Sequence, residues 1–277
     1  MAQSAPNDPI VNAVVGPEAS RFVRLILRSA LGNLDPDLER GEIADAQALY
    51  ANVIMNDILN WWNEDLLENG DVAQTVQIAQ DNVDSALNYS SKLPSALHAR
   101  GLIRRQRGQH NDARKDFREA KRRHSSFARA QAQFGNQKSW LNQLDEVQAP
   151  LDRAIVLDPD HPAIGYCYWA KGRGYFIEAA SASQPDWSDA IKWLQKSVSV
   201  LDTVWYNQLY MAAALNATHD TANVNTANII MNKFVNDPKF GEAVVKRASD
   251  VLLVQNPSSP LEKARQNVYS FIQPWVP

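Results

Sequence analysis

Residues 127–159, "FARAQAQFGNQKSWLNQLDEVQAPLDRAIVLDP", have the pattern of two helices that end at a proline. Gly135 stands inside the first helix, although glycine costs a helix interior about 1 kcal/mol relative to alanine. Ala154 lies in the second helix, and Pro159 cannot continue that helix and closes the unit. A packing requirement explains the glycine, because a bulky side chain there would hold the two helices apart.

The preceding stretch, "SALHARGLIRRQRGQHNDARKDFREAKRRHSS" from Ser95, carries the same markers 34 residues earlier. Self-similarity at a fixed period indicates a repeat architecture, in which each unit buries its apolar face against the next. The paired positions are Gly101 and Gly135, Ala113 and Val147, Phe117 and Leu151, and Ala120 and Ala154.

This pattern resembles the tetratricopeptide repeat (TPR) family, whose 34-residue unit folds as a helix hairpin. The two units depart from the family pattern at Arg100, Arg104, Ser125, Lys138 and Val147. The unit that follows, the fourth in chain order, has an insertion near "SASQPD". Its markers are Gly172, Tyr175, Ala190, Leu194 and Ser197. Weaker units precede and follow these three, with markers at Ala51, Ala79, Val83 and Ala86 and at Ala212, Leu215, Val224 and Met231.

The resemblance implies an all-α, right-handed α-solenoid of about five hairpins with a capping helix at each end. We expect an N-terminal tail and cap over 1–40 and C-terminal capping helices over 239–277, because the terminal units of a solenoid need protection from solvent. The repeats are expected over 41–238, as units 41–93, 94–127, 128–161, 162–203 and 204–238.

A narrower resemblance lies in "YWAxGRxYF", "DAIxWLxxS" and "WYxxLYMAAAL" between residues 168 and 215. These runs are similar to the TPR C-terminal regions of bacterial class III adenylate cyclases and of related membrane-linked transcriptional regulators. The resemblance implies a sensory or regulatory module, either a free-standing relative or an excised region.

The charge of −3 is distributed unevenly. Residues 1–91 hold 14 acids and 4 bases, whereas residues 100–129 hold 11 bases and 3 acids. Such asymmetry indicates a partner or an internal pairing in which an acidic helix faces a basic one.

The single cysteine, Cys167, cannot form an internal disulfide and lies in an apolar helix, where a small buried side chain is expected. It fits a cytoplasmic location. The N-terminus "MAQSAPNDP" could follow a removed signal peptide, so a periplasmic location is the alternative.

The five histidines form no zinc motif, and no nucleophile elbow or phosphate-binding loop occurs. We therefore expect no catalytic residues, no metal and no cofactor. The sequence predicts a non-enzymatic TPR scaffold that binds a protein or peptide in its concave groove.

Four positions on the first helix of each unit should face that groove, since their spacing places them on one helical face. The fourth unit stands out because Tyr166, Trp169, Arg173 and Phe176 would together form an exposed inner face. Its arginine, with those of the preceding units, favours an acidic or carboxylate-bearing peptide. The predicted groove residues are His98, Arg105, Arg129, Asn136, Tyr166, Trp169, Arg173, Phe176 and Tyr206.

Three alternatives stay open. The C-terminal segment could fold back and fill the groove. The module could be a detached sensor that acts through oligomerisation. The second helix of the 94–127 unit could bind nucleic acid through a basic outer face, although it lacks interleaved aromatics. That face comprises Arg114, Lys115, Arg118, Lys121 and Arg122.

Overall fold

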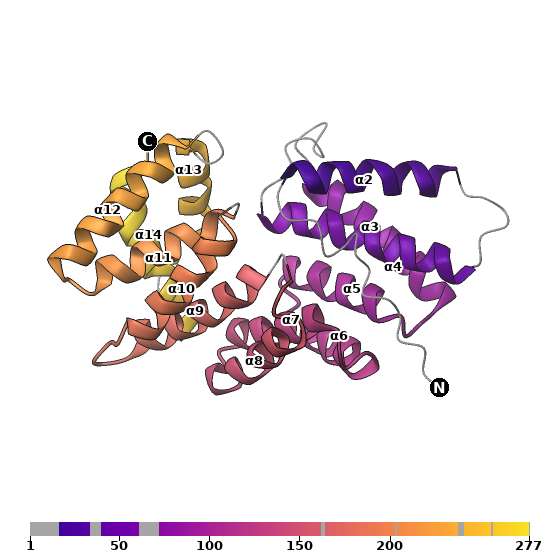
Figure 1. The fold of residues 1–277 in the computed structure, drawn as a ribbon, viewed down its shortest axis with the longest axis horizontal. Coiled ribbons are helices and arrows are strands. Elements are labelled where there is room, and N and C mark those ends of the chain that lie inside the picture. The colour runs from indigo at the N-terminus through magenta and orange to yellow at the C-terminus, as the bar shows by residue number, and fades with distance from the viewer. Residues whose placement is uncertain are drawn as a thin grey trace. The chain divides into compact units, whose positions relative to one another are not determined.

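A computed structural model describes residues 17–33, 40–60, 72–161, 164–202, 204–237, 241–255 and 257–276. These residues form α-helices with two short 3₁₀ turns, and no strand occurs among them (Figure 1). The predicted all-α class is therefore confirmed. The expected N-terminal tail lies outside the described residues.

The chain divides into two compact units. Unit 1 runs to Gln137 and includes the described residues from Val156 to His161, and unit 2 holds Lys138–Ile155 and the described residues from Ile164 onward. In unit 1, α2 packs on α3, α3 packs on both α4 and α5, and α5 pairs with α6. Its helices are α2 (Pro17–Gly32), α3 (Arg40–Asn60), α4 (Val72–Tyr89), α5 (Pro94–Gln106), α6 (His110–Arg123) and most of α7 (Ala128–Trp140).

Unit 2 contains two further hairpins, in which α9 packs on α10 and α11 packs on α12. The last helix, α14, packs against α9 and α11 as well as α13. The elements of unit 2 are the end of α7, η1 (Leu144–Glu146), most of α8 (Gln148–Leu157), α9 (Ile164–Ser181), α10 (Ser188–Val200), α11 (Trp205–Ala217), α12 (Thr221–Asn236), α13 (Gly241–Leu252), α14 (Pro260–Ile272) and η2 (Gln273–Trp275).

Two glycines of the repeat frame, Gly101 and Gly172, lie where two helices approach closely, as the pattern predicts. A Cβ on Gly101 would come within 2.5 Å of the Phe117 ring on the partner helix, and a Cβ on Gly172 within 2.7 Å of Leu194. Both partner side chains are fully buried and cannot move aside. The second-helix markers Ala113 and Ala120 are fully buried too, so the sequence period follows the hairpin contacts.

Serine at the alanine position of the fourth repeat adds a polar bond to the same contact. The Ser197 hydroxyl donates to the Gly165 carbonyl oxygen at 2.8 Å, and a Cβ on Gly165 would meet Leu201 at 2.3 Å. The α9–α10 crossing is therefore held by close packing and by a buried hydrogen bond.

Replacing Gly101 with alanine should destabilise unit 1 by up to about 2 kcal/mol, because an overpacking cost of about 1–3 kcal/mol is only partly offset by a helix-propensity gain of about 1 kcal/mol. Urea denaturation measures this loss. Gly41→Ala is the matched control, since a Cβ there meets nothing within 4 Å, and it should leave stability unchanged or slightly raised. Adding Phe117→Leu to Gly101→Ala should cost less than the sum of the single changes. Full additivity would contradict the close-contact explanation.

The start of α14 is fixed by a capping box. Ser259 accepts from the Glu262 backbone N–H, and the Glu262 carboxylate accepts from the Ser259 and Ser258 backbone N–H groups at 2.9 Å. These backbone donors lower the pKa of Glu262 to about 2. The Leu261 N–H also donates to Asn142 Oδ1 at 3.0 Å, which ties α14 to the loop after α7 within unit 2.

Candidate functional site

The nine predicted groove residues separate between the two units. His98, Arg105, Arg129 and Asn136 lie in unit 1, and Tyr166, Trp169, Arg173, Phe176 and Tyr206 lie in unit 2. We call the four residues in unit 1 the unit 1 cluster and the five residues in unit 2 the unit 2 cluster.

In unit 1, hydrogen bonds fix the tautomer of the buried His98 ring. The side-chain amide of Asn52 donates to the carbonyl oxygens of Ala48 and Ser95, at 2.8 and 3.0 Å. Its oxygen therefore faces His98 Nδ1, 2.6 Å away, and must accept the Nδ1 proton. The neutral ring then presents Nε2 as an acceptor, and this atom has no hydrogen-bond partner among the described residues.

Positive charge surrounds that ring. Burial first, and then the Arg129 and Arg105 charges, lower the pKa of His98 to about 3. Burial and Arg129 likewise lower the pKa of His161 to about 4, against an opposing effect of Asp158. Both imidazoles are therefore neutral at pH 7, and the charge of Arg129 acts on each of them.

The two arginines differ in how they are held. Arg105 is buried and donates to Gln133 Oε1 at 2.6 Å, whereas Arg129 is only half-buried. Asn136 is buried. Arg129 is therefore the more exposed of the two arginines in the unit 1 cluster.

In unit 2 the predicted aromatics pack on one another. The Trp169 ring lies 5.3 Å from Tyr166 and 4.3 Å from Tyr206, measured between centroids. The Arg173 guanidinium lies 4.5 Å from the Trp140 ring centroid and 5.5 Å from that of Trp169. Its Nη1 also donates to the Ser139 hydroxyl at 2.8 Å. These are favourable cation–π distances for an arginine held inside a protein.

Three aromatic neighbours in this cluster escaped the sequence prediction. Phe176 packs edge-on against Trp187 and Tyr210, at 5.0 and 5.2 Å, and Trp140 contacts Arg173. Trp187 belongs to the inserted loop and so lies outside the repeat frame from which the groove residues were predicted. Trp140 is the last residue of α7 and could have been found by extending that helical face by one turn.

The expectation of an exposed inner face in the fourth repeat is wrong. Arg173 is 2% exposed, Trp169 is 7% exposed, and Phe176 is fully buried. Tyr206 is also buried, while Tyr166 is half-buried. These side chains are buried among aromatic neighbours of unit 2. The C-terminal helix α14 packs against α9 and α11, the two helices that carry them.

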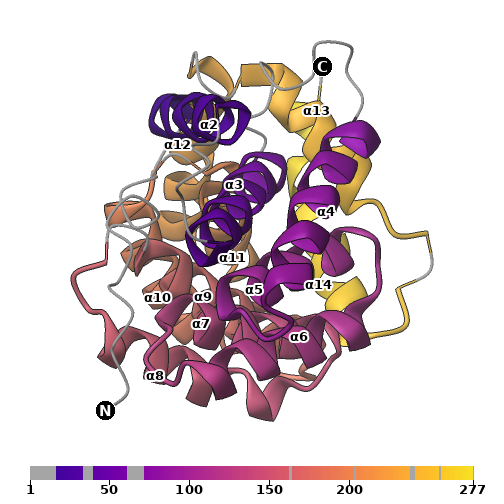
Figure 2. The same ribbon diagram turned by 90° about the vertical axis from the view of Figure 1, so that its right-hand side faces the viewer.

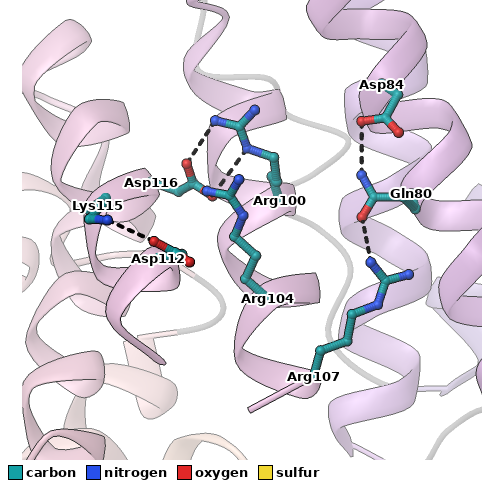
Figure 3. Close-up of polar contacts among 8 residues, drawn as sticks. All are labelled: Gln80, Asp84, Arg100, Arg104, Arg107, Asp112, Lys115 and Asp116. Atoms are coloured by element: carbon teal, nitrogen blue, oxygen red, sulfur yellow. Dashed lines mark hydrogen bonds and ion pairs between the residues drawn. The ribbon is translucent and has the colours of Figure 1, made fainter. Parts of the chain in front are cut away.

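Acids of the same hairpin pair with much of the basic run at 100–129 (Figure 3). Arg100 and Arg104 of α5 both bind the buried Asp116 carboxylate, at 2.8 and 2.7 Å. Lys115 pairs with Asp112 at 2.8 Å and lowers its pKa.

The end of α6 carries a second paired group. Arg122 and Arg123 both bind Glu119, at 2.6 and 2.7 Å, and they lower its pKa to about 2. Lys121 lies 4.2 Å from the Phe134 ring centroid instead. Much of the predicted basic outer face is thus engaged within unit 1.

The acidic helix α4 meets the basic hairpin through an amide. Arg107 donates to Gln80 Oε1 at 3.0 Å, and the Gln80 amide donates to Asp84 at 2.9 Å (Figure 3). The expected acid-to-base pairing therefore occurs partly through a neutral relay.

Unit 2 also contains an open pocket of about 970 Å³ bordered by α10, α11 and α14. Apolar side chains and carboxamides line it, among them Trp187, Ile191, Leu215, Asn216, Asn267 and Phe271.

The described residues form no group of three or more metal-ligating side chains. Cys167 is buried, as expected. Among the described helices, none has an apolar stretch of the length that a bilayer crossing requires.

Solved structures resemble this fold. PilF of Pseudomonas aeruginosa has a TM-score of 0.54 at 14% identity, covering 84% of this chain and 90% of its own. The TPR protein TTC0263 of Thermus thermophilus has a TM-score of 0.50 at 14% identity, covering 72% and 92%. A TPR protein of Parabacteroides merdae ATCC 43184 has a TM-score of 0.50 at 11% identity, covering 92% and 85%.

No protein-family model matches the sequence, and neither does any curated protein. At these identities the structural likeness establishes the fold alone. The chain therefore has the all-α helix-hairpin fold of TPR proteins.

Proposed function

We propose that this protein is a non-enzymatic scaffold that binds an acidic protein or peptide segment on the inner face of its hairpins. The observation that carries the proposal is the pair of arginine charges, Arg129 and Arg105, that act on His98 in unit 1. These charges, which add to burial in lowering the pKa of His98, would also attract a carboxylate. Arg129 is the half-buried member of this cluster, and it is the residue that we assign to contact the partner.

The nine predicted groove residues keep distinct roles in this proposal. Arg129 in unit 1 and Tyr166 in unit 2 are half-buried, and each would touch a partner from its own unit. The other seven are buried and would position these two, as Trp169 does by packing on Tyr166. In unit 2, α14 packs against α9 and α11, the helices that carry the predicted residues. We therefore assign the main contact with the partner to unit 1.

The proposed role is regulatory. The resemblance of residues 168–215 to the TPR regions of adenylate cyclases and transcriptional regulators motivates this interpretation, and the single buried cysteine fits action in the cytoplasm. Nucleic-acid binding at α6 is the weaker candidate, because Glu119 and Asp112 already bind Arg122, Arg123 and Lys115.

Arg129→Glu should weaken binding of acidic peptides by about ten- to a hundredfold, the range expected when a charge-assisted hydrogen bond is lost. Fluorescence anisotropy with peptides rich in aspartate and glutamate, each made with a free and with an amidated C-terminus, measures the affinity. The matched control is Arg118→Glu, which makes the same charge change at an exposed position of α6.

Equal losses in the two variants would mean that only net charge matters and would overturn the site. Loss in Arg118→Glu alone would move binding to the outer face of α6. A single-stranded oligonucleotide tested over a salt series separates the nucleic-acid candidate, since phosphate contacts give a steep salt dependence.

A further inference from the structure

The first helix of unit 1 exposes a stripe of large apolar side chains. Phe22, Leu25 and Ile26 of α2 are 65, 55 and 49% exposed, and they lie within one helical turn of each other. Such a grouped stripe differs from the scattered single hydrophobic residues that are normal on protein surfaces. We call it the α2 outer stripe.

This helix is apolar on two opposite faces. Its inner face carries Leu27, Val23 and Leu31, which join the core cluster formed with α3. The buried Ser20 and Arg24 anchor the same face to Asp57 of α3. The α2 outer stripe is therefore not a misdirected core face, because the core face of α2 is already satisfied.

The position of α2 makes the stripe unusual. Both views show α3 between α2 and α5, so α2 is the outermost of the described helices on this side of unit 1 (Figure 1 and Figure 2). The terminal helix of a repeat array needs a polar outer face to remain soluble. The sequence predicts a cap here, but the side chains suit a surface on which another helix packs.

We propose that the α2 outer stripe is a dimer interface, and that its partner is α2 of a second copy of this chain in antiparallel orientation. An antiparallel pair that sets Phe22 against Leu25 of the other copy also sets Glu18 against Ser29. Glu18 then lies beside Arg28 of the other copy. Both charged side chains are exposed at opposite ends of the stripe.

The charges select both the orientation and the partner. The antiparallel pair joins each Glu18 to an Arg28 twice, by symmetry, as a closed two-fold interface requires. A parallel pair would oppose Glu18 to Glu18 and Arg28 to Arg28. The stripe is thus complementary to itself in one orientation and repulsive in the other.

Sedimentation equilibrium of the full chain tests the apolar part. The wild type should be a reversible dimer, and Leu25→Asn should raise its dissociation constant by about a hundredfold, as loss of a central interface side chain does. Ile229→Ser is the matched control, because Ile229 on α12 is also 61% exposed but lies outside the stripe. It should leave the dissociation constant unchanged, and helical circular dichroism should be the same for all three proteins.

A charge exchange tests the register. Glu18→Arg and Arg28→Glu should each raise the dissociation constant by roughly tenfold, because each places like charges together twice. An equimolar mixture of the two variants should regain wild-type affinity, since the mixed dimer contains only opposite pairs. This recovery cannot arise from an interface elsewhere on the chain.

A monomeric wild type at all accessible concentrations overturns the proposal. So does a dimer that is insensitive to Leu25→Asn, or charge variants that do not recover on mixing. Deleting residues 1–16 should not alter the dissociation constant. Stronger dimerisation of that truncated chain would show that the N-terminal segment occupies the stripe instead.

Discussion

Replacing Asp57 with asparagine should lower the free energy of unfolding of unit 1 by about 3–5 kcal/mol, the range observed when one partner of a buried ion pair is removed. Asp57 is 1% exposed and accepts hydrogen bonds from the Ser20 hydroxyl and the Arg24 guanidinium. Asparagine has nearly the same shape as aspartate but carries no charge. Its side-chain NH₂ group would also face the Ser20 and Arg24 donors, with which it cannot form a hydrogen bond as an acceptor. Arg24 then remains buried without its counter-charge.

Urea denaturation measures the loss, and hydrogen exchange in α2 locates it. Because Ser20 and Arg24 belong to α2, amide protection should fall there first. Asp112→Asn is the matched control: it removes an exposed carboxylate that pairs with Lys115, and surface pairs of this kind contribute little. It should give no measurable change.

A triple variant separates the cost of an unpaired charge from the value of the pair. Ser20→Ala, Arg24→Met and Asp57→Leu together replace the polar cluster with apolar side chains of similar volume. Stability should return to within about 1–2 kcal/mol of wild type, because well-packed apolar groups commonly match a buried ion pair. A triple variant as unstable as Asp57→Asn would contradict this account.

Unit 1 should lose stability as the pH falls below about 6.5, and His98 should account for about one proton of that loss. The folded protein holds the pKa of His98 at about 3, against 6.5 in the unfolded chain. Between these values the unfolded state binds the proton and the folded state does not. Stability therefore rises with pH, by about 1.4 kcal/mol per pH unit for one such group, and becomes independent of His98 above pH 6.5.

His98→Asn isolates this contribution. The asparagine amide nitrogen can replace Nδ1 as donor to Asn52 Oδ1, but it cannot titrate. Urea midpoints measured from pH 4 to pH 7.5 should give a slope smaller by about one proton in the variant. His161, whose pKa is lowered to about 4, adds to the slope in both proteins and so cancels from the comparison. Equal slopes would mean that His98 is accessible to protons in the folded state.

The sequence determined the helix-hairpin class through small residues at a fixed period. Gly101 and Gly172 meet Phe117 and Leu194 as that period requires, because a helix crossing constrains both side chains locally. The apolar helix around Cys167 likewise predicted that this residue is buried. The predicted repeat boundaries and the binding roles of the nine groove residues remain predictions.

Only the tertiary structure decided which side chains are accessible. Trp169 and Arg173 satisfy the groove spacing, yet both are buried, Arg173 against Ser139 and Trp140 of the preceding repeat and Trp169 against Tyr206 of the following one. The α2 outer stripe shows the reverse case, since Phe22 and Leu25 fit a core pattern but lie on the solvent side of α2. Periodicity fixes which residues share a helical face, whereas exposure depends on which later segment packs on that face, and this is a long-range contact that no local pattern encodes.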